Sequence, residues 1–323
     1  MNNNRYILPL KLIKILSNGS IYSKKELSKR LGIIPEYIKD NINILKKWGI
    51  EINTFFKDTY FLNKKMDFLN SEKIYKLVKN GRIIILPIIH STNQYLIECI
   101  EKLKSGDVCI AEYQTNGRGR RGRFWNSPFG YNLYLSLYWN FQKHPIKILG
   151  LNIAISTVIA ETLNKLLNQN KIQSKWPNDI YLNEKKLAGI LIEIIKKIDN
   201  STHIIVGVGL NIKKNKNSIL NTNQQCITLE EAGIIIKKNI IASKLILKLR
   251  YTLLKFEKHG LLPFVDRWLK LDKFLNKTVS LHIGKNHQER GMVKGINEYG
   301  AILLEQKGKI TTYLDGEISL RSN

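Results

Sequence analysis

The pattern of apolar and polar residues changes twice along the chain and predicts three parts. In the first part, residues 1–64, apolar side chains recur at helical spacing, first over residues 8–16. Ser23 and Glu26 form a capping box that begins a second helix. Pro35 suits the first turn of a third one. A short turn between the last two helices predicts a helix-turn-helix.

Two extended segments after the third helix complete this first part. Residues 50–56 and 59–62 are rich in β-branched and aromatic side chains, so we expect a winged helix-turn-helix over residues 1–64. The outward face of its third helix also carries Glu36 and Asp40, which repel phosphate. A small helical domain that binds no DNA therefore stays open as an alternative. The candidate DNA contacts on this face are Lys39, Asn41 and Asn43.

Strand-like and helix-like segments alternate over residues 82–272, after a polar segment, residues 65–81, that we interpret as a linker with one short helix. The strand that begins at His203 is apolar on both faces, which favours a central position, and its glycines suggest the close approach of a bulky group. An α+β fold follows, with a central mixed sheet covered by helices. The expected strands are 83–89, 107–113, 132–139, 180–182, 187–195 and 203–211, and the expected helices 92–103, 146–168, 228–233 and 239–259.

From residue 273 onward the pattern becomes one of short alternating strands separated by glycines. The expected strands are residues 278–283, 289–296, 300–305 and 310–313. Short strands in such close succession predict a small SH3-like β-barrel over residues 273–323.

Composition narrows the class of protein. The 323 residues suffice for two or three domains with a sizeable core. The net charge of +26 predicts retention by polyanions at low salt. However, lysine and asparagine occur in every segment beside abundant isoleucine, so the charge reflects a codon bias toward A and T as much as one basic face.

Cysteine, histidine and hydropathy exclude several kinds of site. The three cysteines lie far apart without a CxxC pair, which argues against a disulfide framework or a zinc site and fits a reducing cytoplasm. The six histidines never take metal-ligand spacing on one element. No apolar run approaches the ~20 residues that a membrane helix needs, so we expect no membrane association.

The segment from Gly117 to Trp125 is the strongest candidate binding site. It holds four arginines among three glycines, and guanidinium groups bind phosphate or carboxylate oxygens in pairs. Predicted strands flank it on both sides, so the loop is anchored in a sheet. A solvated basic loop or a nucleic-acid-binding arginine run is the alternative interpretation. The arginines are Arg118, Arg120, Arg121 and Arg123.

Other polar groups lie at corners between predicted elements. Ser91, Thr92 and Asn93 follow a strand directly and either cap the next helix or hold a polar head group. Lys186 leaves a predicted hairpin, where a surface lysine is the ordinary interpretation. Residues 213–225 are polar without a pattern, which favours a loop that orders on ligand binding.

Taken in order, several motifs closely resemble those of the bifunctional biotin protein ligases, which also repress the biotin operon. The resemblance extends over nearly the whole chain. The motifs are the arginine loop, Lys175-Trp-Pro-Asn-Asp179, Lys186-Leu-Ala-Gly-Ile-Leu-Ile-Glu193, Val206-Gly-Val-Gly-Leu-Asn211, Ser91-Thr-Asn-Gln-Tyr-Leu96, Ala111-Glu-Tyr-Gln114 and Gly316-Glu-Ile-Ser-Leu-Arg321.

The resemblance implies a reaction in two steps. ATP first activates biotin to biotinyl-5'-AMP, and biotin then passes to a lysine of the biotin carboxyl carrier protein of acetyl-CoA carboxylase. Mg²⁺ is expected with ATP, but no carboxylate cluster identifies protein ligands for it. Adenylate binding is further expected to favour a homodimer that binds operator DNA.

The resemblance also implies roles for residues. Catalytic roles fall to Lys186, Arg118, Arg120 and Asp179, with Asp179 orienting or deprotonating the acceptor lysine. The biotin-binding set is Ser91, Thr92, Asn93, Gln114, Arg118, Gly119, Arg120 and Lys186. The ATP- and adenylate-binding set is Arg121, Arg123, Trp125, Asn178 and Asn211.

One departure and two alternatives accompany the resemblance. Cys226 stands where relatives carry a tryptophan at the end of the 213–225 loop, so closure over the adenine is expected to be looser. A DNA-binding regulator that senses a small molecule without ligation is one alternative. A lipoate or octanoate ligase, which shares the general fold of the central part, is the other.

Overall fold

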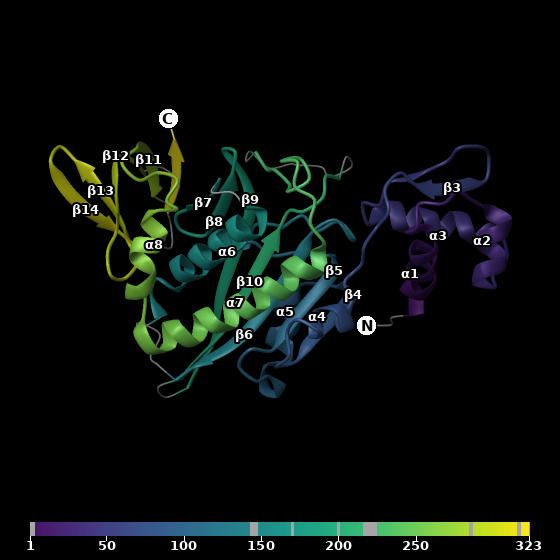
Figure 1. Ribbon diagram of the computed structural model, residues 1–323, viewed down its shortest axis with the longest axis horizontal. Coiled ribbons are helices and arrows are strands. Elements are labelled where there is room, and N and C mark those ends of the chain that lie inside the picture. Colours follow the sequence, from purple (N-terminus) through teal and green to yellow (C-terminus); the bar gives the residue numbers. More distant parts are fainter. Residues whose placement is uncertain are drawn as a thin grey trace.

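The computed structural model describes residues 4–142, 148–168, 171–198, 201–215, 225–283, 287–314 and 318–322. An N-terminal helical unit, a central sheet and a C-terminal sheet follow one another along the molecule (Figure 1). In the described ranges, no helix has the length and apolar character needed to cross a membrane.

The N-terminal unit consists of three helices on a small antiparallel sheet in the order β1-β3-β2. Ser23 caps the second helix in the predicted capping box with Glu26, and Gly32 ends it with a left-handed φ of 65°. Strand β2 is shorter than the predicted segment 50–56, and β1 was not predicted. The elements are α1 (Asn4–Leu16), β1 (Tyr22–Ser23), α2 (Lys24–Leu31), α3 (Glu36–Lys47), β2 (Ile52–Asn53) and β3 (Thr59–Leu62).

Asn41 does not lie on the outward face of α3, so this part of the DNA-contact prediction is wrong. Its side chain is only 7% exposed and donates a hydrogen bond from Nδ2 to the carbonyl of Tyr37 at 2.7 Å. Its position three residues after Ile38 on the helix places it on the buried side. Lys39 and Asn43 are exposed as expected.

Aromatic stacking joins the N-terminal unit to the central part. The ring of Trp48 stacks on that of Phe129 at 5.3 Å and lies 5.9 Å from that of Tyr113. Met66 and Phe68 of the segment interpreted as a linker, residues 65–81, pack against the same cluster. The helix within this segment, α4 (Ser71–Tyr75), was expected.

A buried ion pair in the central part also holds residues 65–81 in place. Lys238 at the start of the long helix α7 pairs with Glu112, and both side chains are almost fully buried. Glu112 also accepts a hydrogen bond from the backbone N–H of Leu69. Removing either charge would leave its partner buried without compensation, which is strongly destabilising.

The central sheet has seven strands in the order β4-β5-β6-β10-β9-β8-β7. Only β4 and β5 run parallel, joined by helix α5, and the remaining pairs are antiparallel. The predicted central strand is confirmed as β10. The strands are β4 (Ile83–Ile89), β5 (Val108–Gln114), β6 (Leu133–Phe141), β7 (Ile172–Lys175), β8 (Asp179–Leu182), β9 (Lys185–Ile198) and β10 (Ser201–Leu210).

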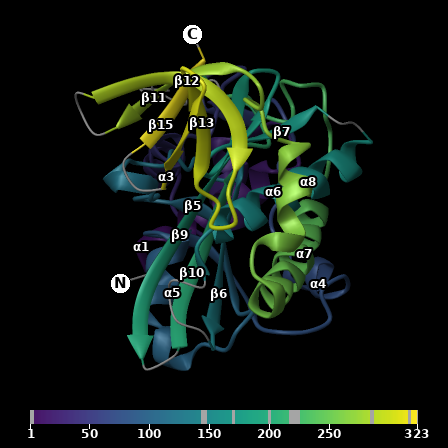
Figure 2. The same cartoon turned by 90° about the vertical axis from the view of Figure 1, so that its left-hand side faces the viewer.

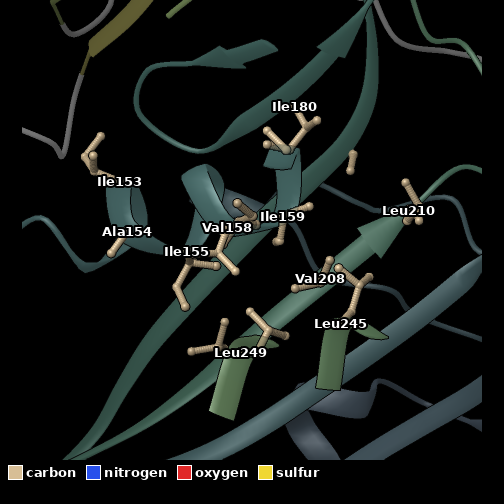
Figure 3. Packing of buried hydrophobic residues seen from close by; sticks show 14 of the residues in the cluster. Ile153, Ala154, Ile155, Val158, Ile159, Ile180, Val208, Leu210, Leu245 and Leu249 are labelled. Carbon is tan, nitrogen blue, oxygen red and sulfur yellow. The ribbon is translucent and has the colours of Figure 1, made fainter. Parts of the chain in front are cut away.

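Two long helices cover one face of this sheet (Figures 1 and 3). Val208 and Leu210 of β10 pack against Leu245 and Leu249 of α7, beside the buried face of α6. Helix α6 begins later than predicted, after Gly150 with its φ of 78°. The expected helix 228–233 is only a turn. The helical segments are α5 (Thr92–Glu98), η1 (Ile100–Lys102), η2 (Arg120–Gly122), α6 (Leu151–Leu167), α7 (Lys238–His259), η4 (Leu262–Phe264) and α8 (Val265–Leu269).

The C-terminal strands form a five-stranded antiparallel sheet in the order β14-β13-β12-β11-β15 (Figure 2). Its inner side chains, such as Val279 and Ile302, belong to the same core as the central sheet. Trp176 donates from its indole to the carbonyl of Gly300 at 2.9 Å. The strands are β11 (Thr278–Ile283), β12 (His287–Ile296), β13 (Ile302–Gln306), β14 (Lys309–Tyr313) and β15 (Ile318–Ser322), the last of which was not predicted.

A buried carboxyl group lies at the junction of the two sheets. Asp272 accepts a hydrogen bond from the N–H of Phe274 at 3.0 Å, and its backbone bridges to Ser174 of β7. Its other oxygen is buried without a hydrogen-bond partner. Burial raises the pKa of Asp272 from 3.8 to about 7.

The raised pKa of Asp272 predicts a pH-dependent stability. The folded chain binds the proton of Asp272 more tightly than the unfolded chain does. The contribution of this group to the free energy of unfolding is therefore largest below about pH 4 and is lost as the pH rises to about 7. The loss amounts to up to about 4 kcal/mol. Asp272→Asn should raise the melting temperature at pH 8 much more than at pH 5. An equal change at both pH values in thermal unfolding would show that this carboxyl does not titrate in the folded protein.

Candidate functional site

The sheet face opposite α6 and α7 carries a patch of glycines. Gly189 of β9 lies across from Gly209 of β10, and Gly207 is two residues away on the same face. A Cβ on Gly209 would lie 2.4 Å from the indole of Trp125, and one on Gly207 would lie 2.4 Å from Oδ1 of Asn93. The missing side chains therefore let Trp125 from a loop and Asn93 from the start of α5 (Thr92–Glu98) lie directly on the sheet.

The arginine segment folds into a tight hairpin over this patch. The N–H of Trp125 donates to the carbonyl of Gly117 at 2.9 Å, and the N–H of Gly119 donates to that of Arg123 at 2.7 Å. Arg121 turns the chain with a left-handed φ of 57°. A Cβ on Gly117 would lie 2.3 Å from the carbonyl oxygen of Trp125, so this position requires glycine. The predicted anchored loop is confirmed.

Two of the four arginines reach toward the sheet. Arg118 donates to Oε1 of Glu193 at 2.6 Å and to Gln94 at 2.7 Å. Arg120 donates to Oδ1 of Asn178 at 3.0 Å. Arg121 and Arg123 lie at the exposed turn of the hairpin. The loop thus divides its cations between the sheet surface and the solvent side.

The strand-to-helix corner at residues 91–93 forms a buried polar network. Ser91 caps α5, and Thr92 donates from its backbone N–H to Gln114 at 2.8 Å. The hydroxyl of Ser136 donates to Oδ1 of Asn93 at 2.5 Å and lies 2.7 Å from the hydroxyl of Thr92. Because these groups are buried and fixed, they can bind a small polar head group with little reorganisation. The corner is more than a helix cap.

Lys186 forms an ion pair at the edge of the glycine patch. Its ammonium lies 2.8 Å from Oδ1 of Asp179, although the two groups are not aligned for a hydrogen bond. The same ammonium lies 5.5 Å from the ring centroid of Trp125, within cation–π range. The indole Nε1 is buried without a partner. A ligand that enters here would meet an ammonium and an aromatic ring.

Asn178 joins this pair to the arginine hairpin. It donates from Nδ2 to the carbonyl of Ile190 at 2.8 Å while accepting from Arg120. Its neighbour Asp179 follows the Trp176–Pro177 peptide bond, which is cis. The Lys-Trp-Pro-Asn-Asp motif therefore brings an amide and a carboxylate to the same edge of the site.

The end of the predicted ligand loop pairs directly with Lys186. The N–H of Lys186 donates to the carbonyl of Gln225, and its carbonyl accepts from Ile227, both at 3.0 Å. Asn211 lies nearby, because its N–H donates to the carbonyl of Leu187. Cys226, which lies between Gln225 and Ile227 in the sequence, is partly buried. Residues 216–224 of this loop lie outside the described residues.

Sequence reasoning missed Glu193, which holds two of the predicted site residues. Besides its bond to Arg118, it accepts from Nδ2 of Asn93 at 2.7 Å. Glu193 lies opposite Ile205 in the sheet, on the glycine face. The signal was present, because a carboxylate inside an otherwise apolar strand is unusual unless it is paired.

Metal ligands are not gathered at this site. Among the residues that the structure describes, no three or more His, Cys, Asp or Glu side chains are grouped to hold a metal ion. The site instead combines preorganised cations, buried polar groups and an aromatic ring. Such a combination is suited to bringing an anionic polyphosphate together with a small carboxylic acid.

Comparison with known proteins supports this chemistry. Residues 85–211 match the model of the "Biotin/lipoate A/B protein ligase family". A protein of Escherichia coli (strain K12) named "Bifunctional ligase/repressor BirA" is 45% identical over 315 residues, which cover 98% of each chain. A "Biotin--[acetyl-CoA-carboxylase] ligase" of Mycobacterium tuberculosis (strain ATCC 25618 / H37Rv) is 25% identical over 66% of this chain and 78% of its own.

A solved structure shows a similar fold. "Biotin protein ligase from Aquifex aeolicus in complex with biotin and ATP" matches with a TM-score of 0.65 at 28% identity. The match covers 75% of this chain and 99% of that one. On the full-length similarity at 45% identity, the chain belongs to the biotin protein ligase family, in the group named bifunctional ligase/repressor.

Proposed function

We propose that the site over the glycine patch activates biotin with ATP and transfers it to a lysine of the biotin carboxyl carrier protein of acetyl-CoA carboxylase. The observation that carries this proposal is the gathering of Lys186, Arg118 and Arg120 around the glycine patch, on which the indole of Trp125 and the side chain of Asn93 lie directly. The names of the relatives support it, and so does the similar structure solved with biotin and ATP.

In the first step, a carboxylate oxygen of biotin attacks the α-phosphorus of ATP. The new P–O bond forms biotinyl-5'-AMP, and the bond to the β-phosphate breaks to release pyrophosphate. Several negative charges meet in this step, so fixed cations stabilise its transition state. Lys186 is positioned for the carboxylate and α-phosphate, and Arg118 and Arg120 close over the ligand.

Biotin occupies the buried polar corner in this proposal. Its ring system carries N–H donors and a carbonyl acceptor, which the network of hydroxyl and amide groups can match. Gly119 brings the backbone of the hairpin close to the ligand. The biotin-binding set is Ser91, Thr92, Asn93, Gln114, Arg118, Gly119, Arg120 and Lys186.

The adenylate lies toward the indole and the end of β10. Trp125 supplies an aromatic face for the adenine. Asn178 and Asn211 bind the ribose or phosphate region, and Arg121 and Arg123 reach the polyphosphate from the exposed turn. Mg²⁺ accompanies ATP as a counter-ion of its phosphates. The described residues offer no carboxylate cluster for it, so it is assigned no protein ligand and no step.

In the second step, the acceptor lysine attacks the carbonyl carbon of the mixed anhydride. An amide bond forms, the bond to the phosphate oxygen breaks, and AMP leaves. The amine must lose a proton to react, and the carboxylate of Asp179 is the base available at the edge of the site. Its ion pair with Lys186 holds the carboxylate in place until the acceptor arrives.

The repressor half of the proposal rests on the N-terminal unit. Its helices and three-stranded sheet support a winged helix-turn-helix over residues 1–64, in which the exposed Lys39 and Asn43 would face operator DNA. Residues 65–81 connect it to a catalytic domain, residues 82–272, and an SH3-like barrel, residues 273–323. A cytoplasmic location suits both substrates.

A homodimer formed on adenylate binding completes the repressor half. Among the described residues, β9 pairs with β8 as far as Gly189 and Ile190 is bonded to Asn178, so the strand has no strand partner on that side after Ile190. A free strand edge is a template for pairing with a second copy. Glu193 lies in this part of β9, so the edge adjoins the ligand site.

One experiment separates this function from its alternatives. The protein is incubated with ATP and either labelled biotin or labelled lipoate or octanoate, with the carrier domain as acceptor. Biotin-dependent pyrophosphate release and labelling of the carrier are expected. Labelling by lipoate or octanoate alone would identify a ligase for those acids, and no labelling by any acid would favour a small-molecule sensor.

Lys186→Ala should lower the rate of adenylate formation by roughly 10²–10³-fold, because one preorganised charge is lost at the reacting phosphate. Pyrophosphate release measures this rate, and far-UV circular dichroism checks the fold. Lys185→Ala is the matched control, since its exposed ammonium is one residue away. Near-normal release by Lys186→Ala would refute the role of this residue.

Glu193→Gln should loosen the arginine hairpin, because the carboxylate that holds Arg118 and Asn93 loses its charge. We expect a KM for biotin that rises roughly tenfold, a smaller change in kcat, and faster tryptic cleavage within residues 117–125. Glu98→Gln, which changes an exposed carboxylate on the neighbouring helix, is the control. Unchanged cleavage together with unchanged KM would mean that Glu193 does not position the loop.

A further inference from the structure

The loop between β2 and β3 presents two large apolar side chains to solvent. Phe55 is 64% exposed and Phe56 is 69% exposed. Their rings pack edge to face with centroids 4.6 Å apart and an interplanar angle of 87°. Exposed apolar groups that adjoin one another often mark a contact surface. Neither ring is used by the ligase site.

This loop is held in one conformation. Thr59 accepts hydrogen bonds at Oγ1 from the N–H groups of Phe55 at 3.2 Å and Phe56 at 2.9 Å. Asp58 takes a left-handed φ of 62°, a conformation that aspartate tolerates better than most residues. Its carbonyl accepts from the N–H of Lys24 at 2.7 Å, which ties the loop to the first turn of α2. The two rings are therefore displayed by a built structure.

The loop also lies where a large partner can reach it. It forms the outer end of the N-terminal unit, on the side away from the central sheet (Figure 1). Residues 1–64 carry twelve lysines and arginines against five carboxylates, a net charge of +7. Lys57 follows the two rings directly and is exposed. Charge complementarity thus favours a polyanion as the partner.

We infer that Phe55 and Phe56 form an apolar wedge that enters the minor groove of duplex DNA and partly unstacks a base step. This inference rests on the proposed repressor function and names how the N-terminal unit holds its DNA. Phenylalanine rings offer no donor or acceptor for reading base edges, whereas apolar side chains do insert between base steps from the minor groove. Lys57 contacts the adjacent phosphates.

The wedge also accounts for the mixed charge of α3. Glu36 and Asp40 are exposed on this helix and repel phosphate, and Asn41 is turned inward. The helix therefore provides fewer DNA contacts than the sequence predicts. The loop between β2 and β3 supplies the others. Steps such as TA unstack most easily, so DNA rich in A·T pairs is the preferred duplex.

The test compares DNA binding of the full-length chain with that of a Phe55→Ser/Phe56→Ser variant, both with biotin and ATP present. The probe is an A·T-rich duplex with 2-aminopurine at a TA step, at one fixed salt concentration, beside a G·C-rich duplex of equal length. Fluorescence anisotropy reports affinity, and 2-aminopurine brightening reports unstacking. Tyr299→Ser, which removes an exposed ring in the turn between β12 and β13, is the matched control.

We expect the double variant to lose roughly tenfold or more in affinity and the brightening signal, while its ligation rate stays that of the wild type. Equal affinity and equal brightening in both proteins would overturn the wedge and leave the repressor proposal standing. A wild type that ligates biotin but binds neither duplex would remove the repressor proposal and the wedge with it. Loss of self-association in sedimentation, with unchanged brightening, would assign the rings to contact between copies and also overturn the wedge.

Discussion

The absence of side chains at Gly189, Gly207 and Gly209 is the constraint on which the site depends. These positions lie on one face of two adjacent strands, and each directly contacts a group that comes from outside the sheet. Any Cβ there would push away Asn93 or the indole of Trp125 by more than packing allows. The opposite face of the same strands is fully apolar and binds α6 and α7. One sheet thus serves as core on one side and as binding surface on the other.

The charges of the site are satisfied within the protein. Arg118 is held by Glu193, Arg120 by Asn178, and Lys186 by Asp179. Such pairing fixes the cations in place, so little reorganisation is needed when a polyanion enters. It also means that an entering anion must compete with the internal partners. A weakly charged ligand would gain little from the exchange, which favours substrates with several negative oxygens.

Sequence patterns predicted most of the regular structure for identifiable reasons. The capping box at Ser23, the long helix α7 and the central strand β10 follow from local chemistry and periodicity, and all are confirmed. The failures arise where tertiary contacts decide. Strand β1 was missed because it has only two residues and is a strand through its pairing with β3.

The same division applies to the site. Glycine and arginine spacing located the hairpin, and the motifs located Lys186 and Asp179 in one place. The role of Glu193 depends on register across the sheet, which periodicity alone does not give. Asn41 was predicted to be exposed because it is polar. It is buried instead, because its side chain donates a hydrogen bond to a backbone carbonyl of its own helix.

One contact links the N-terminal unit to the central part of the protein. Gly49 adopts a φ of 85°, and its carbonyl accepts a hydrogen bond from the side chain of Asn215 at 2.9 Å. A Cβ there would lie 3.0 Å from both Asn215 and Pro128. A lineage that discards the N-terminal unit would therefore uncover Asn215 and the stacked ring of Phe129, and would have to replace both. Loss of that unit is thus a change that the ligase itself must accommodate.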